Sequence, residues 1–186
     1  MSKQKNTTAQ YDAVMTACKD VFIKKTRDYG TSWRVLRPIS IVDQLFIKAQ
    51  RIRTLQEVKT QKVDESIDGE FYAIVNYGII ALMQMSLPTD NPYEDLPLDT
   101  ASNLYTEKAA FVKNVMEAKN HDYGEAWRDM SQESFVDLIL TKLLRIKQIL
   151  RNDGKTLISE GIDANFVDIV NYAVFALILI EEAQVA

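Results

Sequence analysis

One stretch of this sequence is written twice, and this duplication constrains the fold more than any other feature. Lys25 and the segment Asp-Tyr-Gly-Thr-Ser-Trp-Arg at 28–34 return as Lys119 and Asp-Tyr-Gly-Glu-Ala-Trp-Arg at 122–128. A repeat of this kind is the signature of one structural unit used twice. We expect the two units to share a core, because three short helices alone bury little apolar surface.

The match continues beyond the first segment. Lys48-x-x-Arg51-Ile52 returns as Lys142-x-x-Arg145-Ile146, and, after a one-residue insertion, the run from Glu65 to Tyr77 returns as the run from Glu160 to Tyr172. Core packing explains a retained Ile or Phe, but it explains a retained Lys, Asp or Asn less well. The retained polar residues are therefore the candidates for a functional site.

The apolar residues recur at helical spacing, and no segment shows sustained strand-type alternation. We predict an all-α protein with a first three-helix repeat at 9–86, a proline-rich linker at 87–100 and a second repeat at 101–186. Pro38 should bar helix continuation, with Ser40 capping the next helix and Gly30 ending the first. The predicted helices span 9–27, 41–58, 67–86, 102–120, 134–152 and 162–182.

The two middle helices differ in their apolar surface. Leu138, Leu144 and Leu150 stand in the second one where the first has glutamines. A wider apolar face should be more deeply buried, either between the units or in a homodimer contact. We predict a pseudo-twofold helical bundle with this second middle helix at its centre.

Charge and hydropathy limit the partners. The net charge is −4 and the pI is about 5.1, which argues against duplex nucleic acid or an anionic membrane as the main partner. The N-terminus lacks the apolar core of a signal peptide, and the longest apolar run, 172–180, is about half a membrane span. We therefore expect a cytoplasmic protein without membrane contact.

Each middle helix carries two cations one turn apart, Lys48 with Arg51 and Lys142 with Arg145. Like charges at this spacing repel each other unless an acid or a ligand phosphate lies between them. The plainer interpretation is that these cations only keep the surface beside the core soluble. Because both units retain them, a binding role is an equally good interpretation.

The third helices carry acids that could hold a hard cation such as Mg²⁺ through oxygen ligands. The same acids could pair with the lysines and arginines, or simply stabilise a helix N-terminus. Asn76 and Asn171 are unfavourable in mid-helix and should have specific partners in the protein or in a ligand. The candidate metal ligands are Glu65, Asp68, Glu160, Asp163 and Asp168.

The Lys-x-x-Asp-Tyr-Gly-x-x-Trp segment is the most specific motif. Its aromatic residues could be plain packing, or they could form the wall on which a nucleotide base stacks, with the Asp accepting from the base. The residues concerned are Lys25, Asp28, Tyr29 and Trp33 in the first copy and Lys119, Asp122, Tyr123 and Trp127 in the second. Nothing in the sequence suits nucleophilic catalysis.

Together these motifs resemble the nucleotide modification associated domain 1 family, an uncharacterised all-α family, and the resemblance covers both halves of the chain. It implies a link to nucleotide or modified-base metabolism without an established reaction. A more distant similarity is to all-α nucleoside triphosphate pyrophosphatases of the MazG and dimeric dUTPase type. Their Glu-x-x-Glu helix is missing here, because Lys-x-x-Arg stands in its place.

We therefore predict a small-molecule nucleotide site, with Lys142 and Arg145 on phosphate and Mg²⁺ as the candidate cofactor. If it is an enzyme, a hydrolase is expected, and the site containing Asp168 is preferred if only one works. Each Lys/Arg pair should face acids of its own third helix or of the third helix of the other unit. The alternative is a non-enzymatic interaction protein whose charged residues form structural ion-pair networks.

Overall fold

The computed structural model describes residues 6–60, 62–63 and 66–186, and every regular element in this part of the chain is helical. The all-α prediction is therefore confirmed. Two short 3-10 helices, η1 and η2, follow the first helix of each unit. The elements are α1 (Thr7–Tyr29), η1 (Ser32–Val35), α2 (Pro38–Val58), α3 (Ile67–Ser86), α4 (Leu98–Tyr123), η2 (Ala126–Asp129), α5 (Gln132–Arg151) and α6 (Ile162–Val185).

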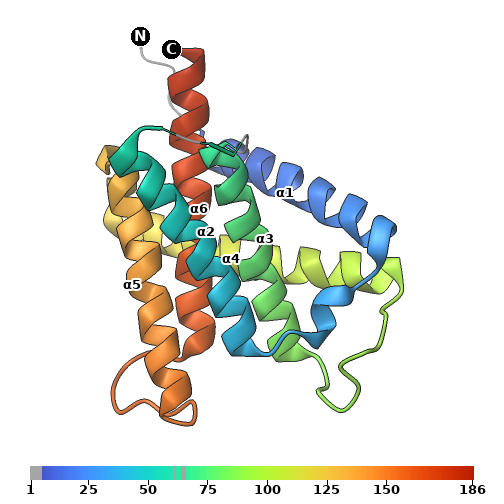
Figure 1. Ribbon diagram of the computed structural model, residues 1–186. Helices are drawn as coiled ribbons and strands as arrows, with labels where there is room; N and C mark the ends of the chain where they lie inside the picture. Colours follow the sequence, from blue (N-terminus) through green and yellow to red (C-terminus); the bar gives the residue numbers. More distant parts are fainter. Residues whose placement is uncertain (1–5, 61, 64–65) are drawn as a thin grey trace.

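Helices α2, α3, α5 and α6 run side by side, and α1 and α4 cross them on the side of α3 and α6 (Figure 1). Every principal contact between helices has a counterpart when the two units are exchanged. Helix α2 packs on α3 as α5 packs on α6, and α1 packs on α6 as α4 packs on α3. This is the pattern that a pseudo-twofold relation between the units produces.

Helices α3 and α6 form the centre of the bundle. Both are apolar on most of their circumference, as expected for helices covered on all sides. They approach closely at Gly78, where a Cβ atom would lie 2.5 Å from a methyl group of Val170. Any larger residue at this position would force the Val170 side chain to shift.

The prediction that the second middle helix is central is wrong. Helix α5 lies at the outside of the bundle, packed on α2 and α6, and Leu144 remains 57% exposed. Its extra leucines are only partly covered by other helices. The central positions are occupied by α3 and α6, because these two helices are apolar all round and burying them removes more apolar surface from water.

Four predicted helix starts also differ from the structure. Helix α5, expected to start at 134, begins at Gln132 after the cap residue Ser131. Helix α1 begins at Thr7, where the Asn6 side chain accepts a hydrogen bond from the backbone of Ala9. Helix α2 begins at Pro38 itself, because proline fits the first helical position, whose N–H has no intrahelical partner. The prediction that Ser40 caps this helix is therefore wrong, since Ser40 lies inside it. Helix α4 begins at Leu98, inside the predicted linker. Gly30 does end α1, as predicted, with a positive φ of 69°.

The retained asparagines join the two units. Asn171 on α6 accepts a hydrogen bond from the Tyr11 hydroxyl at 2.7 Å and donates to the backbone oxygen of Val112. Asn76 on α3 accepts from the Tyr105 hydroxyl at 2.8 Å and donates to the backbone oxygen of Cys18. Each amide therefore holds both α1 and α4, and the two sets of bonds correspond under exchange of the units.

Among the described residues, α6 is long and apolar enough to cross a membrane, but 72% of its apolar window is buried by the other helices. A core helix of a globular bundle has the same length and composition. This helix is therefore weak evidence for a membrane span.

The hydrogen bonds of Asn76 and Asn171 that join the two units are called the interlock below. They predict a measurable loss of stability for Tyr11→Phe. The substitution removes one hydroxyl and leaves the buried Asn171 oxygen without its donor, which should cost about 1–3 kcal/mol in the free energy of unfolding. Urea unfolding followed by circular dichroism measures this cost. Tyr123→Phe is the matched control, since its ring is 74% exposed, and it should change stability by less than about 0.5 kcal/mol. Equal effects of the two variants would contradict the interlock.

Candidate functional site

In the first unit a buried carboxylate lies between α2 and α3. Glu70 is 4% exposed, and its carboxylate accepts from Arg51 at 2.7 Å and from Lys48 at 3.4 Å. The predicted meeting of this Lys/Arg pair with an acid of its own third helix is thus present. The acid is Glu70, which the sequence comparison missed because the aligned residue of the second unit is Asn165.

In the second unit the acid is Asp168, which is 7% exposed. Its two oxygens bind different lysines, Lys119 of α4 at 2.6 Å and Lys142 of α5 at 2.7 Å. Burial alone would raise the pKa of Asp168, but the hydrogen bonds and charges of the two lysines hold this pKa below its ordinary value. The carboxylate is therefore ionised at neutral pH and fixed in place.

Each unit carries three aligned cations, which we call the cation trio: Lys25, Lys48 and Arg51 in the first unit, and Lys119, Lys142 and Arg145 in the second. In each unit the buried acid forms ion pairs with two members of the trio. Asp168 aligns with Ala73, so the acid lies one helical turn later in the second unit. This shift leaves a different cation unpaired. Within the described part of the chain, Lys25 and Arg145 have no ion pair.

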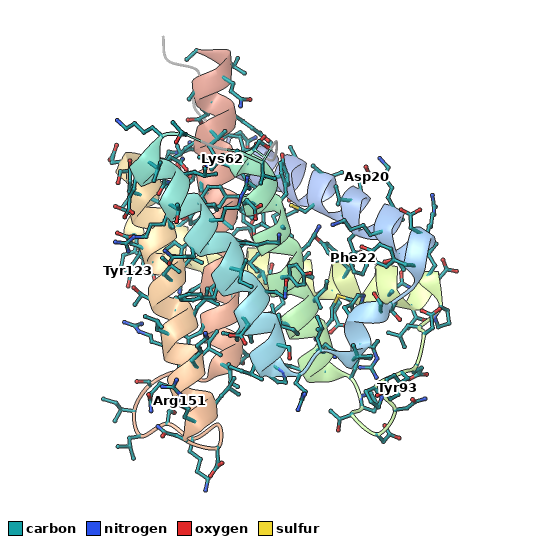
Figure 2. The ribbon with its side chains drawn as sticks, viewed as in Figure 1. Asp20, Phe22, Lys62, Tyr93, Tyr123 and Arg151 are labelled. Carbon is teal, nitrogen blue, oxygen red and sulfur yellow. The ribbon has the colours of Figure 1, made fainter. Side chains whose placement is uncertain are left out.

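A cavity of about 500 Å³, the first-unit cavity, lies between α1, η1, α2 and α3. Its wall combines two cations with aromatic rings. Phe22, labelled in Figure 2, marks the side of α1 that faces the cavity. The structure brings five of the predicted residues to this wall, Lys25, Tyr29, Trp33, Lys48 and Asn76, together with Ala73 and two tyrosines that the sequence analysis did not select, Tyr72 and Tyr77.

The Tyr72 hydroxyl is kept protonated in this wall. Burial, and then the nearby Glu181 carboxylate that accepts its hydrogen bond at 3.2 Å, raise the pKa of Tyr72 to about 12. Asp68, half-buried on the same helix, adds to this rise. Tyr72 is therefore a neutral side chain at physiological pH and adds no negative charge beside the two lysines of the wall.

At the equivalent place in the second unit, two side chains differ in kind from those of the first-unit cavity. The Asp168 carboxylate stands where the first unit has Ala73, and Phe175 stands where it has Ile80. The Phe175 ring stacks on Trp127 with centroids 4.2 Å apart and planes 4° apart. In the first unit the ring neighbour of Trp33 is Phe22, which is tilted by 43° at 6.5 Å. The second unit thus holds an aromatic ring and an anion of its own.

Several predicted ligand-binding residues are engaged in other contacts or lie at the surface. The amides of Asn76 and Asn171 are engaged in the interlock between the units, so the structure gives these two residues a structural role. Asp28, Asp122 and Tyr123 lie exposed at the surface.

An arginine follows the tryptophan in both units, and the sequence analysis did not select it as a candidate. Its contacts explain why this position of the motif is retained. Arg34 is buried and donates to Gln84 and to the backbone oxygen of Pro88. Arg128 donates to Glu182 at the end of α6 and lies over the Trp127 ring. Each arginine therefore anchors its 3-10 helix to neighbouring segments.

The predicted metal ligands do not gather. In the described residues no three His, Cys, Asp or Glu side chains come close enough together to hold a metal ion. Glu160 and Asp163 are exposed, Asp168 is bound by two lysines, and Glu65 lies outside the described residues. The Mg²⁺ prediction stays a prediction.

The Asp168 ion pairs predict a pH dependence of stability. Because the folded-state pKa is lowered, the stabilisation is complete above the ordinary Asp value of 3.8 and is lost as the pH falls through the lowered pKa. Asp168→Asn should cost about 1–3 kcal/mol at pH 7. Its stability should then fall less than that of the original chain on acidification below about pH 4. Urea unfolding at a series of pH values measures both effects.

Asp28→Asn is the control for this experiment, since Asp28 is exposed and has no ion pair with a described residue. It should leave the acid-dependent loss of stability intact. If Asp168→Asn and Asp28→Asn follow the same pH curve, the ion pairs do not stabilise the fold.

Comparison with protein families places both units of the chain in a known family. The family described as nucleotide modification associated domain 1 matches twice, at residues 25–85 and 119–180, which together make up more than half of the chain. No curated protein and no solved structure matches, and the more distant pyrophosphatase similarity is not shown. The two matched segments contain both cation trios, both tryptophans and both buried acids. The chain therefore belongs to the nucleotide modification associated domain 1 family, as two tandem copies.

Proposed function

We propose that the first-unit cavity binds a nucleoside monophosphate. The observation that carries this proposal is a pair of side chains, one anionic and one aromatic, that the second unit has at the equivalent place and the first unit lacks. There, Asp168 provides an anion between two lysines, and Phe175 provides a flat ring on Trp127. The first unit keeps Lys25, Lys48 and Trp33 but has Ala73 and Ile80 instead of these groups. A ligand with one anionic group and one aromatic ring would complete the same set of contacts.

The phosphate would lie beside Ala73. Lys119 and Lys142 both reach one carboxylate at 2.6–2.7 Å, so the aligned Lys25 and Lys48 can converge on one anion in the same place. Lys48 is shared with Glu70 at 3.4 Å, whereas Lys25 has no ion pair with a described residue. Two lysines around one acceptor position favour a single phosphate over a triphosphate chain.

The base would lie against the aromatic part of the wall. Trp33, Tyr29 and Tyr77 line the cavity, and stacking of a base on such rings contributes about 1–3 kcal/mol per base. The cavity of about 500 Å³ falls in the range of ordinary small-molecule sites. The family name, with its link to nucleotide modification, supports the same class of ligand.

This proposal moves the preferred site from the second unit to the first. In the second unit, the ion pairs of Asp168 and the stacked ring of Phe175 fit the alternative interpretation, in which charged residues stabilise structure. The proposal covers binding and assigns no reaction, because no nucleophile or general base stands out among the described residues of the cavity wall.

Ala73→Asp tests the proposal, because it gives the first unit the carboxylate that Asp168 gives the second. Thermal shift and calorimetry with nucleoside mono-, di- and triphosphates, with and without Mg²⁺, measure binding. For the original chain, a monophosphate at about 100 times its dissociation constant should add about 2.7 kcal/mol of stability. Ala73→Asp should lose this response, because its own carboxylate neutralises Lys25 and Lys48.

Two comparisons make the test specific. Ala73→Asn has nearly the same size as Ala73→Asp but no charge, so it should bind the monophosphate better than Ala73→Asp does. Inorganic phosphate should bind at least tenfold more weakly than the nucleoside monophosphate, because it lacks a base to stack. No response of the original chain to any nucleotide would refute the proposal.

A further inference from the structure

A second cavity, the second-unit cavity, lies at the C-terminal end of α5, beneath the segment 152–161 that leads to α6. Its volume is about 730 Å³, and none of its lining residues lines the first-unit cavity. Figure 1 shows this segment at the lower end of α5, and Figure 2 labels Arg151 beside it. We infer that this cavity is a separate phosphate-binding site built on Arg145.

A difference between the two units at one aligned position, Glu70 against Asn165, distinguishes Arg145 from Arg51. In the first unit the aligned Arg51 donates to the buried Glu70 at 2.7 Å. The residue aligned with Glu70 is Asn165, which is 5% exposed and donates to the backbone oxygen of Gly161 at 2.8 Å. Arg145 thus shares its cavity wall with a neutral amide at the position where the first unit has the carboxylate that binds Arg51, and it has no ion pair with a described residue.

The other lining residues suit an anion held by Arg145. Lys155 and Lys142 line the same cavity, with Lys142 already bound to Asp168, and Glu160 is the one acid among the described lining residues. Asn152 and Thr156 add neutral hydrogen-bonding groups. An arginine guanidinium has a rigid fork of N–H donors that matches the oxygens of a phosphate, which points to a phosphate group as the ligand.

The inference does not depend on the function proposed for the first-unit cavity. The two sites use different members of the cation trio, Lys25 in one unit and Arg145 in the other. The position of the acid on the third helix decides which cation is available. A chain with one duplicated trio can therefore present two anion sites of different shape.

The test is a calorimetric titration with inorganic pyrophosphate at low salt, in the full chain carrying Ala73→Asp so that the first-unit cavity does not contribute. Pyrophosphate should bind. Adding Asn165→Glu places a carboxylate opposite Arg145, as Glu70 lies opposite Arg51, and should weaken binding by about tenfold or more. The matched Asn165→Gln change has similar size without charge and should weaken binding by less than about threefold.

Two further variants keep the test decisive if Asn165→Glu impairs folding. Arg145→Gln changes an exposed residue and should also weaken pyrophosphate binding by about tenfold or more. Glu160→Gln removes the acid of the cavity wall and should tighten binding. Absence of pyrophosphate binding, or binding that Arg145→Gln leaves unchanged, would overturn the inference.

Discussion

A single buried carboxylate, paired with two of three aligned cations, is the interaction on which the differences between the two units depend. One turn of helix separates Glu70 from the position that Asp168 occupies in the other unit. A carboxylate at the first position binds the cations of the middle helix, and one at the second position reaches a lysine of the first helix as well. Because a buried charge must be paired, moving the acid changes which cation remains available.

The rest of the bundle keeps these groups in register. Helices α3 and α6 pack closely at Gly78, and the asparagine–tyrosine bonds hold α1 and α4 against both of them. The third helix carries the acid, the middle helix carries two cations and the first helix carries the third. All three must therefore be fixed relative to one another before a cavity with a defined charge can form.

Much of this architecture follows from the sequence because helical periodicity and duplication are local signals. The six helices, Gly30 as the end of the first helix and the meeting of Lys48 with an acid of its own third helix could all be predicted. Glu70 could not, because the search looked for residues kept in both units. A difference between aligned positions, Glu70 against Asn165 and Ala73 against Asp168, would have pointed to it.

The sequence by itself determined the helical class, the two units, the family and the pool of charged and aromatic candidates, since periodicity and motif spacing are properties of the chain alone. Only the tertiary structure decided which candidates meet. It used the asparagines to join the units, kept α5 at the outside and formed an aromatic, cationic cavity in the first unit. The physical reason is that pairing and burial depend on distances between helices, and a shift of the acid by one turn changes which of the three cations is left without an ion pair.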